Sequence, residues 1–89
     1  MYNFIVSEHF HDILKKLSKK DKNLHKQILK KIDEIINCYD VGHYKNLRYN
    51  MKDSKSVHIG HFVLVFQFDK KTKTINFDDF DHHDKVYKR

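Results

Sequence analysis

The chain has 89 residues, of which 18 are Lys or Arg, 12 are Asp or Glu and 8 are His, so its formal net charge is +6. This length allows one domain over residues 1–89, and the single cysteine, Cys38, excludes an intramolecular disulfide. No apolar run reaches the roughly 18 residues of a membrane-spanning helix and no signal peptide is recognisable, so we expect a cytoplasmic protein without a membrane partner.

The first half of the chain predicts a strand followed by two helices. Tyr2, Phe4 and Val6 lie at alternate positions, which predicts a short strand at the start of the chain. Ser7 can cap the first helix, and the polar residues 18–21 predict a turn in which Asp21 caps the second. Both helices have one apolar face, so they should form an antiparallel hairpin. We expect the hairpin to end at residues 40–42, because glycine favours helix C-termini.

Positive charge is concentrated on these two predicted helices. Between residues 15 and 31, Asp21 is the only acid opposed to a set of lysines, namely Lys15, Lys16, Lys19, Lys20, Lys22, Lys26, Lys30 and Lys31. Two interpretations remain open for this set. It is either an ordinary solvated helix surface or a surface for an anionic partner, which would be RNA or an acidic protein segment.

The second half changes to the periodicity of strands. Leu47 and Tyr49 predict a short strand, and residues 51–55 predict a polar loop. Residues 57–59 alternate, and Gly60 with His61 can form the tight turn of a hairpin.

The strand that follows this turn is almost continuously apolar. Residues 62–68 predict a central strand that is covered on both faces, residues 69–73 a hairpin loop, and residues 74–78 a final strand. The predicted fold is therefore α+β in the order β-α-α-β-β-β-β, with the helical hairpin packed on one face of a mostly antiparallel sheet.

Several residues of the second half could carry chemistry. Four of the histidines and four of the cations gather there, namely His58, His61, His82, His83, Lys45, Arg48, Lys52 and Lys55. Cleavage of RNA without a metal needs a base for the 2′-hydroxyl, an acid for the leaving 5′-oxygen and cations for the transition state. Histidine can be either acid or base at neutral pH, and Tyr87 could stack on a nucleobase.

Four segments carry a resemblance to a known family. They are Leu47-Arg48-Tyr49, Val57-His58-Ile59-Gly60, Val63-Leu64-Val65-Phe66 and His82-His83-Asp84-Lys85-Val86-Tyr87. In this order they resemble successive landmarks of RelE-type toxins of the RelE/ParE superfamily, and in particular the YafQ-like subgroup. The resemblance spans nearly the whole chain, but only the sheet and the C-terminal segment are diagnostic.

The resemblance implies the toxin of a type II toxin–antitoxin system with a RelE-like fold. Such a toxin enters the ribosomal A site and cuts messenger RNA by attack of the 2′-hydroxyl, with no metal or other cofactor. An antitoxin of the RelB or DinJ type neutralises it by wrapping it with helices. The partners implied are thus the antitoxin, the ribosome and messenger RNA.

The resemblance also implies roles for individual residues. His58 is a candidate acid, base or phosphate contact, His83 a candidate general acid or base, Tyr87 the aromatic residue that stacks on the substrate base, and Arg48 a catalytic cation. The further candidates for RNA or phosphate binding are Lys45, Lys52, Lys55, His61 and His82.

Two features depart from the family pattern. Many RelE toxins have an arginine at the start of the central strand, where this chain has Val63, and His61 is the candidate substitute. In addition, an acidic stretch lies near the proposed site at residues 78–81. Carboxylates repel RNA phosphates, so these side chains should point elsewhere or pair with cations.

Other functions remain open. A metal ion could be bound by Asp78, Asp79, Asp81, His82, His83 and Asp84, although adjacent residues of a strand point to opposite faces. The chain could also be a non-catalytic ParE-like inhibitor of DNA gyrase, or a degenerate toxin that only binds its antitoxin. Cys38 is expected to be a small core residue, since no neighbouring base indicates a nucleophile.

Overall fold

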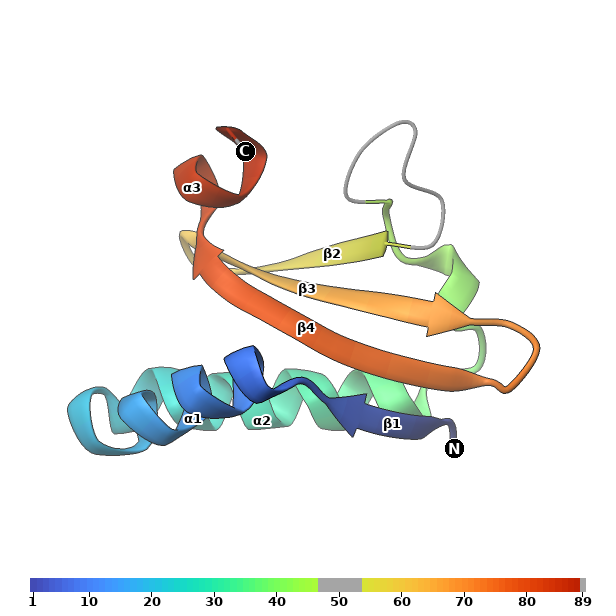
Figure 1. The fold of residues 1–89 in the computed structure, drawn as a ribbon, viewed down its shortest axis with the longest axis horizontal. Coiled ribbons are helices and arrows are strands. Elements are labelled where there is room, and N and C mark those ends of the chain that lie inside the picture. The colour runs from blue at the N-terminus through green and yellow to red at the C-terminus, as the bar shows by residue number, and fades with distance from the viewer. Residues whose placement is uncertain (47–53, 89) are drawn as a thin grey trace.

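The computed structural model describes residues 1–46 and 54–88, which form two main layers (Figure 1). One layer is a helical hairpin, and the other is a sheet in which the strands stand in the order β1-β4-β3-β2. The elements are β1 (Asn3–Val6), α1 (Glu8–Lys20), α2 (Lys22–Asn37), the 3₁₀ turn η1 (Val41–His43), β2 (Ser54–Ile59), β3 (Phe62–Asp69), β4 (Thr74–His82) and α3 (His83–Lys88).

Within the sheet, β1 is parallel to β4, and β4 with β3 and β3 with β2 are antiparallel. The α+β class and the helical hairpin on a mostly antiparallel sheet are therefore confirmed. The strand predicted at Leu47 and Tyr49 lies outside the described residues. None of the helices in the described residues is long and apolar enough to cross a membrane.

Both predicted helix caps are present. The Ser7 Oγ accepts a hydrogen bond from the Phe10 amide at 3.1 Å, and the Asp21 Oδ1 accepts one from the Leu24 amide at 3.0 Å. The turn between the helices is shorter than predicted, because α1 continues to Lys20. Polar residues at the end of α1 are tolerated because they face solvent there, so the polar pattern marked a helix surface and not a loop.

The end of the hairpin also differs from the prediction. Helix α2 stops at Asn37, and Cys38 already has an extended backbone, with ψ of 159°. Gly42 is not the C-terminal residue of this helix but lies in η1, where its amide donates to the Asp40 Oδ1 at 2.9 Å. An aspartate cap, and not glycine, therefore shapes this connection.

The β2–β3 hairpin turns at Gly60 and His61, as predicted. Gly60 has a φ of +61°, which suits glycine at the first position of a two-residue loop. Residues 54 and 55 were expected in a loop but begin β2. Lys55 is tolerated in this strand because its Nζ donates to the Asn46 Oδ1 at 2.7 Å, while its backbone lies opposite Phe66.

Strand β4 is longer than predicted and reaches His82. Val65 pairs with Asp79 but Phe66 pairs with Phe77, so Asp78 is the extra residue of a β-bulge. The bulge changes which positions of β4 face the helices. The regular alternation therefore breaks at Asp78, and this is why the sequence suggested that the strand ended there.

The core has two parts, on opposite faces of the sheet. The larger part lies between the helices and the sheet and includes the fully buried side chains of Phe10, Ile28, Ile35, Leu64, Phe66 and Phe77. On the other face, Val63 and Val65 of β3 are covered by Val86 of α3, with Tyr87 beside them. The start of β3 is thus buried on both faces, which confirms the prediction for the central strand.

Candidate functional site

The candidate site forms where α3 covers the end of the sheet on the face opposite α1 and α2 (Figure 1). Helix α3 begins directly after β4, and the His83 amide donates to the His61 carbonyl in the β2–β3 turn at 2.9 Å. Val86 is 3% exposed and anchors the helix on β3. The sequence reasoning missed this helix, although the spacing of His83, Val86 and Tyr87 suits one helical face.

Three predicted residues come together here. His58 lies opposite Val63 in the register of β2 and β3, so its side chain is on the face that α3 covers. Its ring centroid is 5.4 Å from that of His83 and 6.3 Å from that of Tyr87, with interplanar angles of 27° and 24°. The His83 and Tyr87 rings are 4.7 Å apart. The two imidazoles and the phenol therefore form one cluster.

Ser56 is a further member of this cluster that sequence reasoning missed. Its Oγ and the Tyr87 hydroxyl are 3.1 Å apart, and either oxygen can be the donor. Ser56 is 5% exposed and Tyr87 is half-buried, so this hydrogen bond is partly protected from water. Its position two residues before His58 on the same strand face is the signal that could have identified it.

The predicted cations separate into two groups. The Ser56 amide donates to the Lys45 carbonyl, and the bridge between Asn46 and Lys55 places Lys45 opposite Ser56. Directly opposed residues share a sheet face, so the exposed Lys45 side chain extends from the face that carries the cluster. Lys55 lies on the other face, with its Nζ on Asn46.

Arg48 and Lys52, the two other predicted cations, lie outside the described residues. Their roles stay predictions, as does a phosphate-binding role for Lys55.

His61 and His82 form a second pair, with ring centroids 6.3 Å apart and nearly parallel rings. His82 lies opposite Phe62 and contacts that ring edge-on at 5.7 Å, which places it on the helix-facing side of the sheet. The Asp84 amide also donates to the His82 Nδ1 at 3.2 Å, so His82 helps to begin α3. The structure therefore does not bring His61 and His82 into the cluster, and their predicted role in RNA binding stays a prediction.

The acidic residues near the site are largely engaged within the protein. The Asp79 Oδ1 lies 2.9 Å from the His9 Nε2 and accepts from the Phe80 amide at 2.8 Å. The Asp81 Oδ1 accepts from the His82 amide at 2.7 Å. Over residues 1–46 and 54–88, no group of three His, Cys, Asp or Glu side chains is placed to hold a metal ion.

Val63 is the position at which the resemblance to RelE-type toxins predicts an arginine. It is fully buried beneath α3, between His58 on β2 and Asp81 on β4 in the sheet register. The predicted substitute, His61, is paired with His82 instead. Within the described residues, Lys45 is the predicted cation that shares a sheet face with the cluster.

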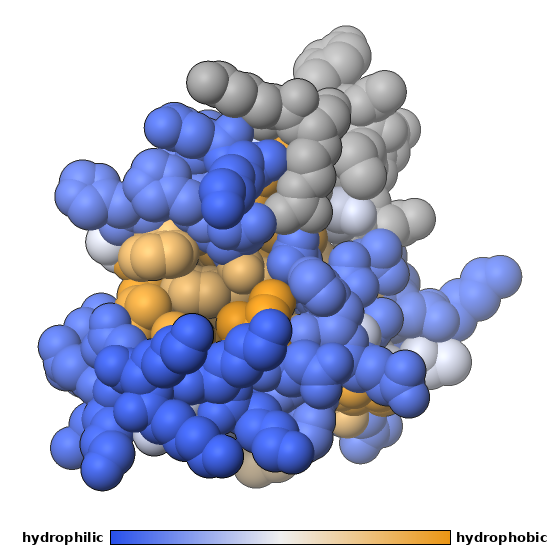
Figure 2. Space-filling model, turned by 60° about the vertical axis from the view of Figure 1, so that its left-hand side comes forward, coloured by the Kyte–Doolittle hydropathy of each residue, from blue (hydrophilic) through white to orange (hydrophobic). Residues whose placement is uncertain are grey.

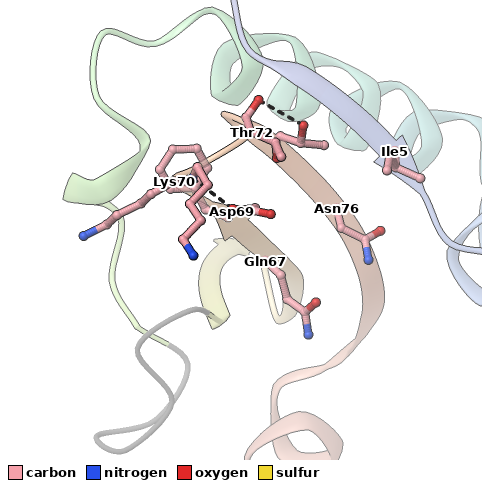
Figure 3. A pocket seen from close by; sticks show the side chains of 9 residues that line it. Ile5, Gln67, Asp69, Lys70, Thr72 and Asn76 are labelled. Carbon is pink, nitrogen blue, oxygen red and sulfur yellow. Dashed lines mark hydrogen bonds between the residues drawn. The ribbon is translucent and has the colours of Figure 1, made fainter.

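A separate hollow of about 720 Å³ lies at the far end of the sheet, beside the β3–β4 hairpin (Figure 3). Gln67 and Asn76 line it next to Ile5 of β1. The Asn76 Oδ1 is buried there without a hydrogen-bond partner. This hollow is larger than one of about 280 Å³ that His58 lines, but its own lining residues include no histidine or tyrosine that could act as an acid or base. We therefore place the candidate site at α3.

Cys38 packs against the main core and is partly buried. Burial raises the pKa of its thiol. This supports its interpretation as a core residue.

Comparisons with known proteins agree with this fold. The family described as the ParE toxin of the type II toxin–antitoxin system parDE matches residues 4–87. A protein of Methanocaldococcus jannaschii, described as a candidate toxin RelE4, is 50% identical over 90 residues, which cover 100% of this chain and 94% of that protein.

Solved structures show the same architecture. The isolated RelE toxin of Escherichia coli has a TM-score of 0.70 at 18% identity, over 99% of this chain and 93% of that one. YafQ of E. coli has a TM-score of 0.68 at 16% identity, over 98% and 99%. The toxin–antitoxin complex RelBE2 of Mycobacterium tuberculosis has a TM-score of 0.60 at 20% identity, over 92% and 98%. The chain therefore belongs to the ParE toxin family of type II toxin–antitoxin systems, within the RelE/ParE superfamily.

Proposed function

We propose that this toxin is a ribosome-dependent endoribonuclease that cuts messenger RNA without a metal ion. The observation that carries the proposal is the cluster of His58, His83 and Tyr87, in which two imidazoles lie 5.4 Å apart next to a phenol. A non-catalytic binding surface does not need an acid and a base side by side.

The chemistry requires two proton transfers. One imidazole takes the proton of the 2′-hydroxyl, whose oxygen attacks the adjacent phosphorus. The other gives a proton to the departing 5′-oxygen, which leaves a 2′,3′-cyclic phosphate and a 5′-hydroxyl. His58 and His83 are both exposed and can reach a substrate, and the ring of Tyr87 can stack on a base beside the scissile phosphate.

Negative charge that develops on the phosphate must be balanced by cations. Val63 supplies none, so this role falls to Lys45 on the cluster's face of the sheet. Arg48 and Lys52 are the further candidates. A single lysine is a weaker clamp than a bidentate arginine, so we expect slower cleavage than in a toxin that has the arginine.

We further propose that a RelB- or DinJ-type antitoxin binds this toxin in the cytoplasm. The RelBE2 structure shows that a toxin with this fold assembles with an antitoxin. An area of hydrophobic side chains is exposed between hydrophilic surfaces (Figure 2), and such areas suit protein partners. Co-expression with the adjacent open reading frame should give a stable complex, and recovery of the toxin alone would contradict this proposal.

A second candidate function is the inhibition of DNA gyrase. It is favoured by the match to the ParE family and by Val63 in place of a catalytic arginine. The purified toxin should be added to a translation reaction with a defined message and, separately, to a gyrase supercoiling assay. We expect cleaved message and normal supercoiling. Intact message with blocked supercoiling would establish the second function, and no effect in either assay would indicate a degenerate toxin.

A further inference from the structure

A hollow of about 280 Å³ lies directly beside the cluster, where the β2–β3 turn faces helix α2. Lys30, Lys31 and Glu34 of α2 line one side, and His58 and Gly60 line the other. His58 therefore borders two spaces. Its ring lies against His83 and Tyr87 on the sheet face, and the same residue borders the hollow that leads to the lysines of α2.

The charges in this hollow do not cancel. The Lys31 Nζ donates to the Glu34 Oε2 at 2.9 Å, and this contact holds the pKa of the Glu34 carboxyl below its usual value. The pair is therefore neutral as a whole. Lys30 is exposed and forms no hydrogen bond or ion pair within the described part of the chain, and its charge also helps to lower the pKa of the Glu34 carboxyl. The two lysines and the one carboxylate therefore leave a net charge of +1 in this hollow, which His58 also lines.

The hollow also has room for a ligand at the turn. Apart from the two chain neighbours of Gly60, no heavy atom lies within 4 Å of a Cβ built at this residue, so the space there is open. An anionic, solvated and narrow ligand fits a small hollow that has a net positive charge. A phosphate of a single nucleic-acid strand is such a ligand, since basic grooves track the backbone of single strands.

We propose that this hollow binds a phosphate of single-stranded RNA through Lys30, next to the phosphate that is cleaved. The proposal rests on the proposed function and extends it to the path of the substrate. The strand would run from Tyr87 and His83, across His58 at the edge of β2, and onto the basic surface of α2. Part of the lysine-rich surface of the helical hairpin would then contact RNA directly.

The test is the salt dependence of RNA binding, measured by fluorescence anisotropy with a short 2′-O-methyl RNA that cannot be cleaved. For single strands, each phosphate contact contributes about 0.7 to the slope of log K against log salt concentration. Lys30→Ala should reduce the slope by about this amount and weaken binding. The matched control is Lys70→Ala, which removes the same charge from an exposed site at the opposite end of β3.

An unchanged slope in Lys30→Ala, equal losses in both variants, or no binding by the wild type would overturn the proposal. This readout is independent of cleavage. A slope change specific to Lys30 in a protein that cuts no message would leave the hollow as an RNA site and refute only the catalytic function. Cleavage that persists with an unchanged slope would refute only the hollow.

Discussion

His58 and His83 come from distant parts of the chain, and each is positioned by its neighbours. The register of β2 against β3 sets the face of His58, while the bond from the His83 amide to the His61 carbonyl fixes the start of α3. Tyr87 is held by its hydroxyl on Ser56. The site therefore consists of few residues, and the distances between them depend on where α3 lies.

The first prediction separates the ring of Tyr87 from its hydroxyl. Tyr87→Phe keeps the ring and loses only the hydrogen bond to Ser56, so its cleavage rate should match that of Ser56→Ala. Tyr87→Ala also removes the stacking surface, which is worth about 1–3 kcal/mol per base. Cleavage assays on ribosome-bound message can compare the variants. A Phe variant as inactive as the Ala variant would show that the hydroxyl takes part in proton transfer.

The second prediction concerns the reactivity of Cys38. Because burial raises the pKa of this thiol, the folded protein holds less of the reactive thiolate than the unfolded chain at the same pH. Alkylation by iodoacetamide at pH 8, followed by mass spectrometry, should be slower in buffer than in denaturant. Faster alkylation of the folded protein would contradict the interpretation of Cys38 as a core residue.

At the scale of elements, α1 and α2 could be predicted from the sequence, whereas α3 at the end of the chain could not. The faces of α1 and α2 repeat every three to four residues, and Ser7 and Asp21 mark their starts, so local signals suffice. Helix α3 has only Val86 and Tyr87 to pack, and it exists because β3 offers Val63 and Val65 beneath it. The spacing of its residues fits a helix, but so short a helix is stable only through tertiary contacts, which that spacing does not reveal.

The candidate site, too, could be predicted from the sequence only in part. His58, His83 and Tyr87 could be identified from the sequence, because a family pattern and the required chemistry agree on them. The separation of His61 and His82 from that cluster depends on the bulge at Asp78 and on the step from β4 into α3, which only the structure shows.

The third prediction tests the dependence of the site on α3. Val86→Ala should cost roughly 1–2 kcal/mol of apolar burial. This lowers the equilibrium constant for packing of α3 on β3 by about 5- to 30-fold. Cleavage should fall accordingly, and hydrogen exchange should accelerate in residues 83–88 first. The control is Ile28→Ala in the main core, which should lower global stability by about 2–5 kcal/mol. Equal acceleration of exchange throughout the Val86→Ala protein would refute the local role.

At the scale of the whole molecule, the two faces of the sheet have different roles. One face buries the main core against α1 and α2, and the other carries the cluster, to which α3 contributes His83 and Tyr87. The stability of the domain therefore depends mainly on one side of the sheet, and the proposed chemistry is on the other. Substitutions in the cluster should leave the fold intact, which makes them suitable for testing function.

The most direct test is the single-turnover rate of message cleavage in the A site of stalled ribosomes, measured by toeprinting for the wild type, His83→Ala and His11→Ala. His11 is an exposed histidine of α1 and serves as the control. Loss of a general acid or base should lower the rate by about 10²- to 10⁴-fold in His83→Ala, with His11→Ala unchanged. Equal rates in all three proteins, or message that stays intact with the folded wild type, would contradict the proposed site.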